Sequence, residues 1–206
     1  GDGAYVKLTD VDAPYAYGTK GVDYRRTVAM IKLNDEDFYV ADFFRVKGGS
    51  EHHYSFHGAE GTVETEGLNL TPQTDFAGKY IGTYGGENTE FGIRPPQDTT
   101  NSGFHWLINV RKDEEPEDVF SVDWHVKDTW NALGKGKKTD IHIRLTMLSK
   151  VDDATVATGI PPRNKPGNPK ELEYLIARRS GNDLDSLFVS VIEPYKGERN
   201  VEKIER

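Results

Sequence analysis

Alternation of hydrophobic and polar residues is the dominant pattern along this chain. The clearest example is segment 139–148, whose apolar positions are Ile141, Ile143, Leu145 and Met147. The polar positions between them are Asp140, His142, Arg144 and Thr146. A period of two places these sets on opposite faces of a strand, with one face in a core. Segments 118–126 and 104–111 repeat the pattern and predict two further strands.

The segment Asp23–Gly58 predicts three more strands, separated by turns at Asn34–Asp37 and Gly48–Ser50. Aliphatic runs at 172–179 and 186–193 add two strands. We expect at least nine strands and no helix longer than a few turns. Residues 67–101 are the least regular part, and they predict either a long loop laid over a sheet or a short hairpin followed by a loop. The predicted fold is all-β: one antiparallel β-sandwich domain over residues 1–206, with two packed sheets and long irregular loops.

Composition narrows the possible functions. The 206-residue chain contains 21 Gly and 10 Pro, which indicates many turns, and its aromatic content suits half-buried strands. A formal net charge of −8 argues against a nucleic-acid partner, which would require a basic surface. The chain has no Cys, so its stability depends on the core rather than on disulfides. No apolar run is long enough to predict a membrane span.

Three of the six histidines lie in the sequence EHHYSFH at positions 51–57. Alternation places His53 and His57 on the same face of the predicted strand. Two such histidines could bind a metal, with Asp42 on the preceding strand as a candidate third ligand. The alternative is a strand whose partly buried histidines form hydrogen bonds with neighbours. Because no full ligand set is present, the sequence predicts neither a metal nor another cofactor.

Asp42 lies among apolar residues. Its neighbours on the same predicted face are Val40, Phe44 and Val46. A carboxylate in such surroundings is buried and needs a partner. Arg25 or Arg26 on the adjacent strand could supply a bidentate ion pair. We favour this structural role for Asp42 over the alternatives of metal ligand or general base.

Aromatic side chains provide candidates for stacking on a sugar. Trp106 and Trp124 fall on apolar faces of predicted strands, so we assign both to the core. Trp130 lies beside a polar loop, and Tyr80 and Tyr84 lie in the irregular region. These three residues are therefore better candidates for an exposed binding surface.

Arg178 is the candidate ligand for an acidic sugar. The pair Arg178-Arg179 places one guanidinium on each face of a predicted strand. An ion pair with one of the abundant carboxylates is the alternative for either arginine. His53 and His57 complete the set of candidate substrate-binding residues. No nucleophile elbow, P-loop or dinucleotide-binding fingerprint is present, and no residue is predicted to be catalytic.

Three blocks of the sequence resemble the C-terminal β-sandwich region of heparinase II/III-like polysaccharide lyases. The first is YRRTVAMI with YVADFFRVKGGSEHHYSFHG, within Tyr24–Gly58. The second is EGLNLTPQTDFAG, at Glu66–Gly78. The third runs from DIHIRLTML at Asp140–Leu148 to SLFVSVIEPYKG at Ser186–Gly197. The blocks occur in the family's order and together span nearly the whole chain.

The resemblance implies part of an enzyme rather than a complete one. Such lyases look like an N-terminal α/α toroid followed by β-sheet regions, and they cleave uronic-acid polysaccharides by β-elimination. The family's metal-site signatures, His-x-His-x-Asp, Asp-x-Gly and Arg-x-x-His-Asn-Thr, do not occur in this sequence. We expect them upstream of Gly1, and we interpret the start at Gly-Asp-Gly as an excised or processed boundary. No catalytic role carries over to a residue of this chain.

Two function classes remain from the sequence. The first is the β-sandwich portion of a lyase, which supports or closes the substrate cleft of a toroid domain and contacts an acidic polysaccharide. The second is a stand-alone carbohydrate-binding or assembly module. An autonomous metal-dependent enzyme built on Asp42, His53 and His57 is a less favoured third possibility. The resemblance further implies a secreted bacterial protein of the periplasm or the extracellular space.

Overall fold

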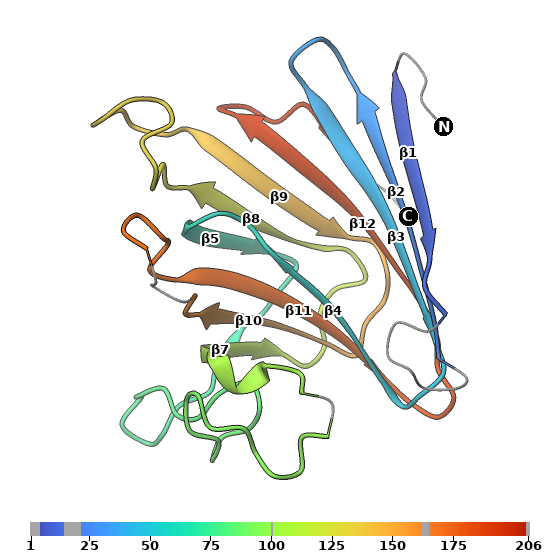
Figure 1. Ribbon diagram of the computed structural model, residues 1–206, viewed down its shortest axis with the longest axis vertical. Helices are drawn as coiled ribbons and strands as arrows, with labels where there is room; N and C mark the ends of the chain where they lie inside the picture. The colour runs from blue at the N-terminus through green and yellow to red at the C-terminus, as the bar shows by residue number, and fades with distance from the viewer. Residues whose placement is uncertain (1–4, 15–21, 100, 162–164, 205–206) are drawn as a thin grey trace.

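The computed structural model describes residues 5–14, 22–99, 101–161 and 165–204. Within these residues the chain forms twelve strands and one short 3₁₀ helix, arranged as two packed antiparallel sheets (Figure 1). The predicted all-β sandwich is therefore confirmed. No helix in the described part of the chain is long and apolar enough to cross a membrane.

The larger sheet has seven strands in the order β1-β2-β3-β12-β9-β8-β5. Their bounds are Val6–Asp12 (β1), Asp23–Lys32 (β2), Phe38–Lys47 (β3), Gly61–Glu66 (β5), Phe120–Val126 (β8), Ile141–Met147 (β9) and Asp185–Lys196 (β12). The first three strands follow one another along the chain. The last strand, β12, then joins them to the remainder of the sheet by pairing with both β3 and β9.

The smaller sheet has five strands in the order β4-β11-β10-β7-β6. Their bounds are Glu51–His57 (β4), Thr71–Pro72 (β6), Leu107–Asp113 (β7), Asp153–Gly159 (β10) and Leu172–Ser180 (β11). The chain passes from β4 in this sheet to β5 in the larger sheet at Gly58. A side chain at Gly58 would meet the ring of Trp124, at 2.6 Å from its Cγ, so this crossing requires glycine.

The main core lies between the two sheets. Its largest fully buried side chains include Trp124, Tyr54, Phe120, Phe188 and Leu145. The alternation predicted for residues 118–126 and 139–148 is confirmed, because Phe120, Val122 and Trp124 share the inner face with Leu145 and Met147. Burial of each such side chain contributes about 1.5–3 kcal/mol to the stability of the fold.

The strand predicted at 104–111 was placed wrongly. Residues Phe104–Trp106 form the 3₁₀ helix, and β7 begins only at Leu107. A β-bulge opposite Val156 and Thr158 then contains Asn109, whose φ is 52°. The extra residue shifts the alternation within β7, so Leu107 and Val110 are both buried, whereas Trp106 in the 3₁₀ helix is 47% exposed. The assignment of Trp106 to the core is therefore corrected.

The irregular region between β5 and β7 covers the outer face of the five-stranded sheet. Gln73 N–H donates to Val110 O, and Tyr84 N–H donates to Leu107 O, which ties the region to β7. Isolated bridges join Thr74 with Tyr80 and Thr83 with Gly86. A second small core forms beneath it, in which Tyr84, Phe104 and Tyr174 pack against Leu107, Val110, Ala157 and Ile176. This arrangement combines both alternatives predicted for residues 67–101.

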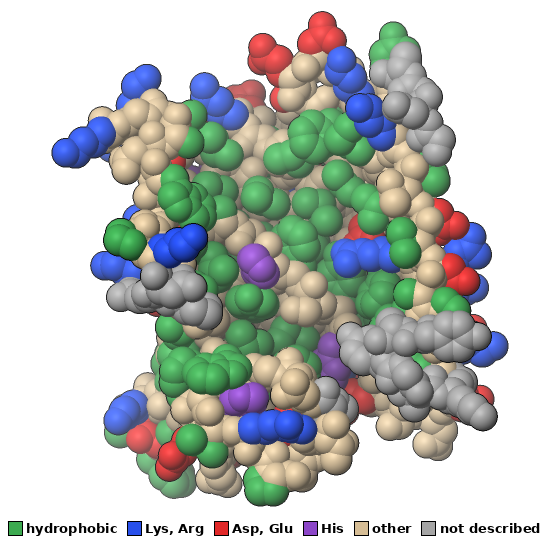
Figure 2. All heavy atoms as spheres, in the orientation of Figure 1, with side chains coloured by type: hydrophobic (Ala, Val, Ile, Leu, Met, Phe, Trp, Pro, Cys, Tyr) green, Lys and Arg blue, Asp and Glu red, His purple; other side chains and the backbone are tan. Residues whose placement is uncertain are grey.

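The seven-stranded sheet extends beyond the five-stranded sheet. In Figure 2, hydrophobic side chains gather in the middle of the viewed face. In the same orientation in Figure 1, this area includes the part of the larger sheet around β3, β12 and β9. Strand register puts six half-buried apolar residues on the inner face of this part: Val28, Met30, Phe38, Val40, Ile141 and Ile143. We call this set the open face. The chain exposes 12916 Å², whereas a compact 23.1 kDa monomer exposes about 9,700 Å².

Candidate functional site

A pocket with a volume of about 1240 Å³ lies at one end of the sandwich. One wall is the outer face of the five-stranded sheet, from which His53, Lys112, Asp153 and Arg178 project. The irregular region supplies a second wall that includes Tyr84. Tyr24, Phe44 and Val46, at the adjoining ends of β2 and β3, supply the third. The pocket therefore collects side chains from both sheets and from the long connection.

An ion pair between Arg178 and Asp153 lies in this pocket. Arg178 Nε and Nη2 both donate to Asp153 Oδ2, at 2.6 and 2.5 Å. Lys112 Nζ lies 3.7 Å from the same oxygen, and Arg178 Nη1 lies 3.7 Å from Glu51 Oε2. The Asp153 side chain is 2% exposed, whereas those of Arg178 and Lys112 are 28% and 36% exposed. The two cations therefore keep accessible surface beside a buried carboxylate.

His53 sits beside this ion pair, on the neighbouring strand. Register pairs it directly with Arg178, and its Nε2 lies 3.0 Å from Glu51 Oε1. Its ring packs edge-on against Phe104, with centroids 4.9 Å apart. Burial lowers the pKa of the imidazole below its ordinary value of 6.5, although Glu51 opposes the shift. His53 is therefore neutral near pH 7 and can both donate and accept a hydrogen bond.

Tyr84 supplies a phenol at the same pocket. Its ring packs against Phe104 in a T-shaped contact, with centroids 4.7 Å apart. Burial raises the pKa of the hydroxyl well above its ordinary value of 10.0, and the charge of Asp153 adds to this effect. Tyr84 therefore keeps its proton and is a hydrogen-bond donor at any physiological pH.

Three polar atoms of residues that line the pocket are buried, with almost no accessible surface, and have no hydrogen-bond partner among the described residues. They are Asp153 Oδ1, Thr155 Oγ1 and His105 Nδ1. A buried polar atom without a partner is costly, and native proteins contain few of them. The accessible polar groups of the pocket are instead the Glu51 carboxylate and the His53 ring, which can bind hydroxyl groups, and the cations Arg178 and Lys112, which can bind a carboxylate.

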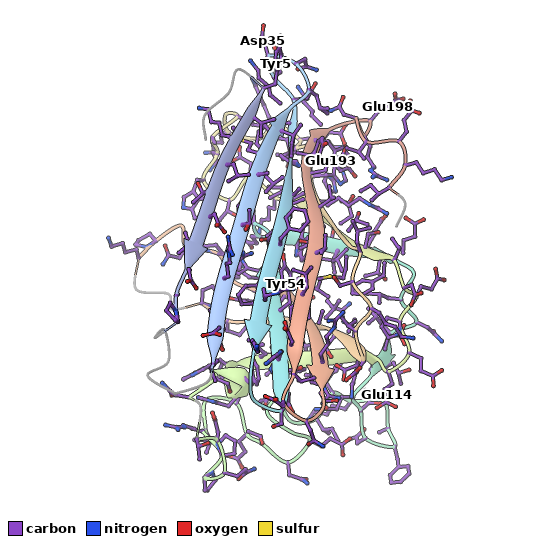
Figure 3. All side chains as sticks on the ribbon, turned by 90° about the vertical axis from the view of Figure 1, so that its right-hand side faces the viewer. Tyr5, Asp35, Tyr54, Glu114, Glu193 and Glu198 are labelled. Atoms are coloured by element: carbon purple, nitrogen blue, oxygen red, sulfur yellow. The ribbon has the colours of Figure 1, made fainter. Side chains whose placement is uncertain are left out.

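Asp42 lies elsewhere, between the two sheets, and is 1% exposed. Arg26 Nε donates to Oδ1 at 2.8 Å, and Arg26 Nη2 donates to Oδ2 at 2.6 Å. The hydroxyl of Tyr54, which is labelled in Figure 3, crosses from β4 to donate to Oδ2 at 2.9 Å. Arg25 points to the other face of β2, where it binds Asp10. Of the two arginines that the sequence allowed, Arg26 is the partner of Asp42.

The structure brings together three of the six predicted substrate-binding residues: His53, Tyr84 and Arg178. The other three lie outside the pocket. His57 is at the far end of β4, where its ring contacts Tyr174. Trp130, 63% exposed, lies in the β8–β9 loop, and Tyr80 is 39% exposed within the irregular region.

The metal set of Asp42, His53 and His57 does not assemble. Asp42 faces the interior of the sandwich together with Tyr54 of β4. His53 and His57 alternate with Tyr54 along that strand and face the other side of the five-stranded sheet. This weak candidate for a metal site is therefore corrected.

Sequence reasoning missed Asp153, Lys112 and Glu51 as members of the site. Asp153 is opposite Arg178 only because of the register between β10 and β11. The sequence signal was a carboxylate next to small and apolar residues in DATVATG, which is comparable to the apolar neighbours that singled out Asp42. Trp106 was also missed as a surface residue. It is stacked edge-on against Phe91, with centroids 5.2 Å apart, and both rings are more than 40% exposed.

The fold defines the class of this protein as a two-sheet antiparallel β-sandwich with a polar pocket at one end. Comparison of the sequence with protein-family models and with curated proteins found no match. The assignment of a function therefore depends on the chemistry of the pocket and on the open face.

Proposed function

We propose that this chain is the β-sandwich portion of a uronic-acid polysaccharide lyase, and that its pocket binds an acidic saccharide at the edge of the substrate cleft. One observation carries the proposal. Arg178 and Lys112 remain accessible in a pocket that also presents His53, Tyr84 and the half-exposed carboxylate of Glu51. Cations that can bind a carboxylate therefore stand beside acceptors that can bind sugar hydroxyls.

The mixture of charges supports a uronate more than a simple anion. Asp153 and Glu51 partly neutralise Arg178, so a sulfate or phosphate would meet repulsion as well as attraction. A sugar acid instead presents hydroxyl donors to the Glu51 carboxylate while its own carboxylate accepts from the cations. The volume of about 1240 Å³ exceeds that of most small-ligand pockets, which suits more than one sugar ring.

The open face supports the further proposal that a helical domain of the parent enzyme packs against this sandwich. Its six apolar residues are only half-buried, and a contiguous apolar face of this kind is typical of a surface that another domain covers. In this arrangement the toroid supplies the base for β-elimination and the sandwich orients the polymer.

The test is a calorimetric titration of the full chain with a uronic-acid tetrasaccharide and with a neutral tetrasaccharide of the same length. We expect binding of the acidic ligand only, and we expect Arg178→Gln to weaken it by about tenfold or more. Arg25→Gln is the matched control, because it removes the same charge from an exposed ion pair on the other sheet. Equal binding of both ligands, or equal loss in both variants, would refute the uronate pocket.

A second measurement tests whether catalysis depends on the proposed helical domain. We expect the chain alone to release no unsaturated uronide from heparin, heparan, chondroitin or alginate, as followed by ultraviolet absorbance. Eliminase activity of the isolated chain would show that it is a complete enzyme and would overturn the proposed role of a partner domain.

A stand-alone carbohydrate-binding module is the second candidate function. The exposed Phe91–Trp106 pair favours it, because exposed aromatic rings can stack on sugar rings without regard to charge. This function predicts binding of the neutral tetrasaccharide and its loss in Trp106→Ala. The same two titrations therefore distinguish the two candidates.

A further inference from the structure

A histidine pair lies on the outer face of the seven-stranded sheet, away from the pocket. His125 on β8 is paired in register with His142 on β9. Their rings are nearly parallel, with centroids 4.6 Å apart and an interplanar angle of 5°. Asp140 immediately precedes β9. One potential ligand atom from each of these three residues lies within 4.8 Å of the others.

Hydrogen bonds orient His142 as they orient a metal-binding histidine. Its Nδ1 lies 2.7 Å from Asp123 Oδ1, and an ionised carboxylate can only accept, so Nδ1 donates. In the neutral ring Nε2 then carries a lone pair. Nε2 lies 3.8 Å from Asp140 Oδ1, so two acceptors face each other. A carboxylate behind a histidine is the usual outer support of a zinc ligand.

His125 has the same kind of support from the backbone. Its Nε2 lies 2.9 Å from Thr139 O, and a carbonyl oxygen can only accept a hydrogen bond. In the neutral ring its second nitrogen is therefore free to act as a ligand. The backbone next to Asp140 is also fixed, because Gly197 N–H donates to Asp140 O at 3.1 Å.

The Asp123 carboxylate that orients His142 is itself held in place. It is 7% exposed, and the Tyr195 hydroxyl donates to its Oδ2 at 2.6 Å. The Tyr195 ring also stacks on His142, with centroids 4.7 Å apart and an interplanar angle of 15°. His142 is therefore held from two sides, and the His125 ring would turn out of its parallel arrangement so that both nitrogen lone pairs point to one ion.

We propose that His125, Asp140 and His142 form a binding site for a borderline divalent metal ion such as Zn²⁺. Two imidazoles and one carboxylate are ligands that Zn²⁺ accepts, and a water molecule would complete four-coordination. Hard ions such as Mg²⁺ and Ca²⁺ prefer oxygen ligands and are excluded by this donor set. The ion would bridge the two ends of the loop between β8 and β9, because His125 lies near the end of β8 and Asp140 is the last residue of this loop. This site is independent of the proposed saccharide pocket.

The experiment is a titration of the full chain, first freed of metal with a chelator, with Zn²⁺ and separately with Mg²⁺. We expect saturable binding of one Zn²⁺ per chain and no binding of Mg²⁺. His142→Gln should abolish the binding. Asp123→Asn, which removes only the outer support, should weaken it by about 10–100-fold. Co²⁺ in place of Zn²⁺ should give the visible absorption of a four-coordinate site.

One control and one further ligand variant complete the test. His57→Gln removes a histidine from the other sheet and should leave Zn²⁺ affinity unchanged. Asp140→Asn alters a side chain that is 69% exposed, so it tests the third ligand without a risk to folding. Absence of saturable Zn²⁺ binding would refute the site. Saturable binding that persists in both Asp140→Asn and His142→Gln would refute it equally.

Discussion

Asp42 and Asp153 are both buried carboxylates paired with an arginine, yet their surroundings differ. Asp42 lies between the sheets, and both of its oxygens accept hydrogen bonds, from Arg26 and Tyr54. Asp153 lies in the pocket, where Arg178 binds one oxygen and the other has no partner among the described residues. A saturated buried ion pair is what a structural role requires, whereas the Asp153 pair leaves the accessible Arg178 for a ligand.

The largest expected effect is on the free energy of unfolding, and it distinguishes the two carboxylates. We expect Asp42→Asn to lower the free energy of unfolding by about 2–4 kcal/mol, because it disrupts a buried network that joins the sheets. Asp153→Asn should cost about 1 kcal/mol, since Asp153 has fewer hydrogen bonds to lose. Urea denaturation measures both values.

For saccharide affinity, the order of the two effects should be the opposite of their order for stability. Asp42→Asn should leave the affinity for the uronate tetrasaccharide unchanged, whereas Asp153→Asn should alter it. Asp10→Asn, which changes an exposed pair with Arg25, is a control that should affect neither property. Loss of binding with unchanged stability in Asp42→Asn would show that Asp42 is the functional carboxylate.

Removal of either of two tyrosine hydroxyls should have a smaller effect, on stability in one case and on saccharide binding in the other. Tyr54→Phe removes the contacts with Asp42 and Ser190 and should cost about 1 kcal/mol of stability. Tyr84→Phe should leave the denaturation midpoint almost unchanged and should weaken uronate binding instead. Similar destabilisation by both substitutions would mean that the pocket is as much a part of the structural core as the interior.

The smallest expected effect is the pH dependence that His53 contributes. Burial lowers its pKa in the folded state below the ordinary value of 6.5, so the unfolded chain binds its proton more readily. The contribution of His53 therefore favours folding above that pH and weakens as the pH falls through it, by at most about 1.4 kcal/mol per pH unit. Comparison of urea midpoints for wild type and His53→Gln between pH 5 and 8 isolates this term. Identical pH profiles would show that His53 is not buried as described.

The sequence was sufficient for the fold class and for much of the core. Alternation identified Phe120, Val122 and Trp124 as inward-facing because that strand is regular. It failed at Trp106 because Phe104–Trp106 form a 3₁₀ helix before β7, and because the bulge at Asn109 shifts the alternation within the strand that follows. The position of Asp42 predicted an arginine partner, but the choice between Arg25 and Arg26 required the β2–β3 register.

The pocket was less predictable than the core. His53, Tyr84 and Arg178 were recognised as suitable residue types, but their convergence depends on how the irregular region lies over the smaller sheet. Asp153 and Arg178 become neighbours only through the pairing of β10 with β11. Such long-range placement is decided by packing of the whole domain, which the pattern along one strand does not report.

The position of β12 in the larger sheet has a consequence for how the chain is made. Register pairs Ser190 of β12 with Asp42 of β3, so β3 lacks its second neighbour until β12, which lies far along the chain, has been synthesised. Until then the β1–β3 segment on the ribosome presents an unpaired edge rich in aromatic residues, which is prone to intermolecular pairing. Non-local pairing of this kind also slows folding. The nascent chain is therefore expected to depend on chaperones that shield β3 until β12 emerges.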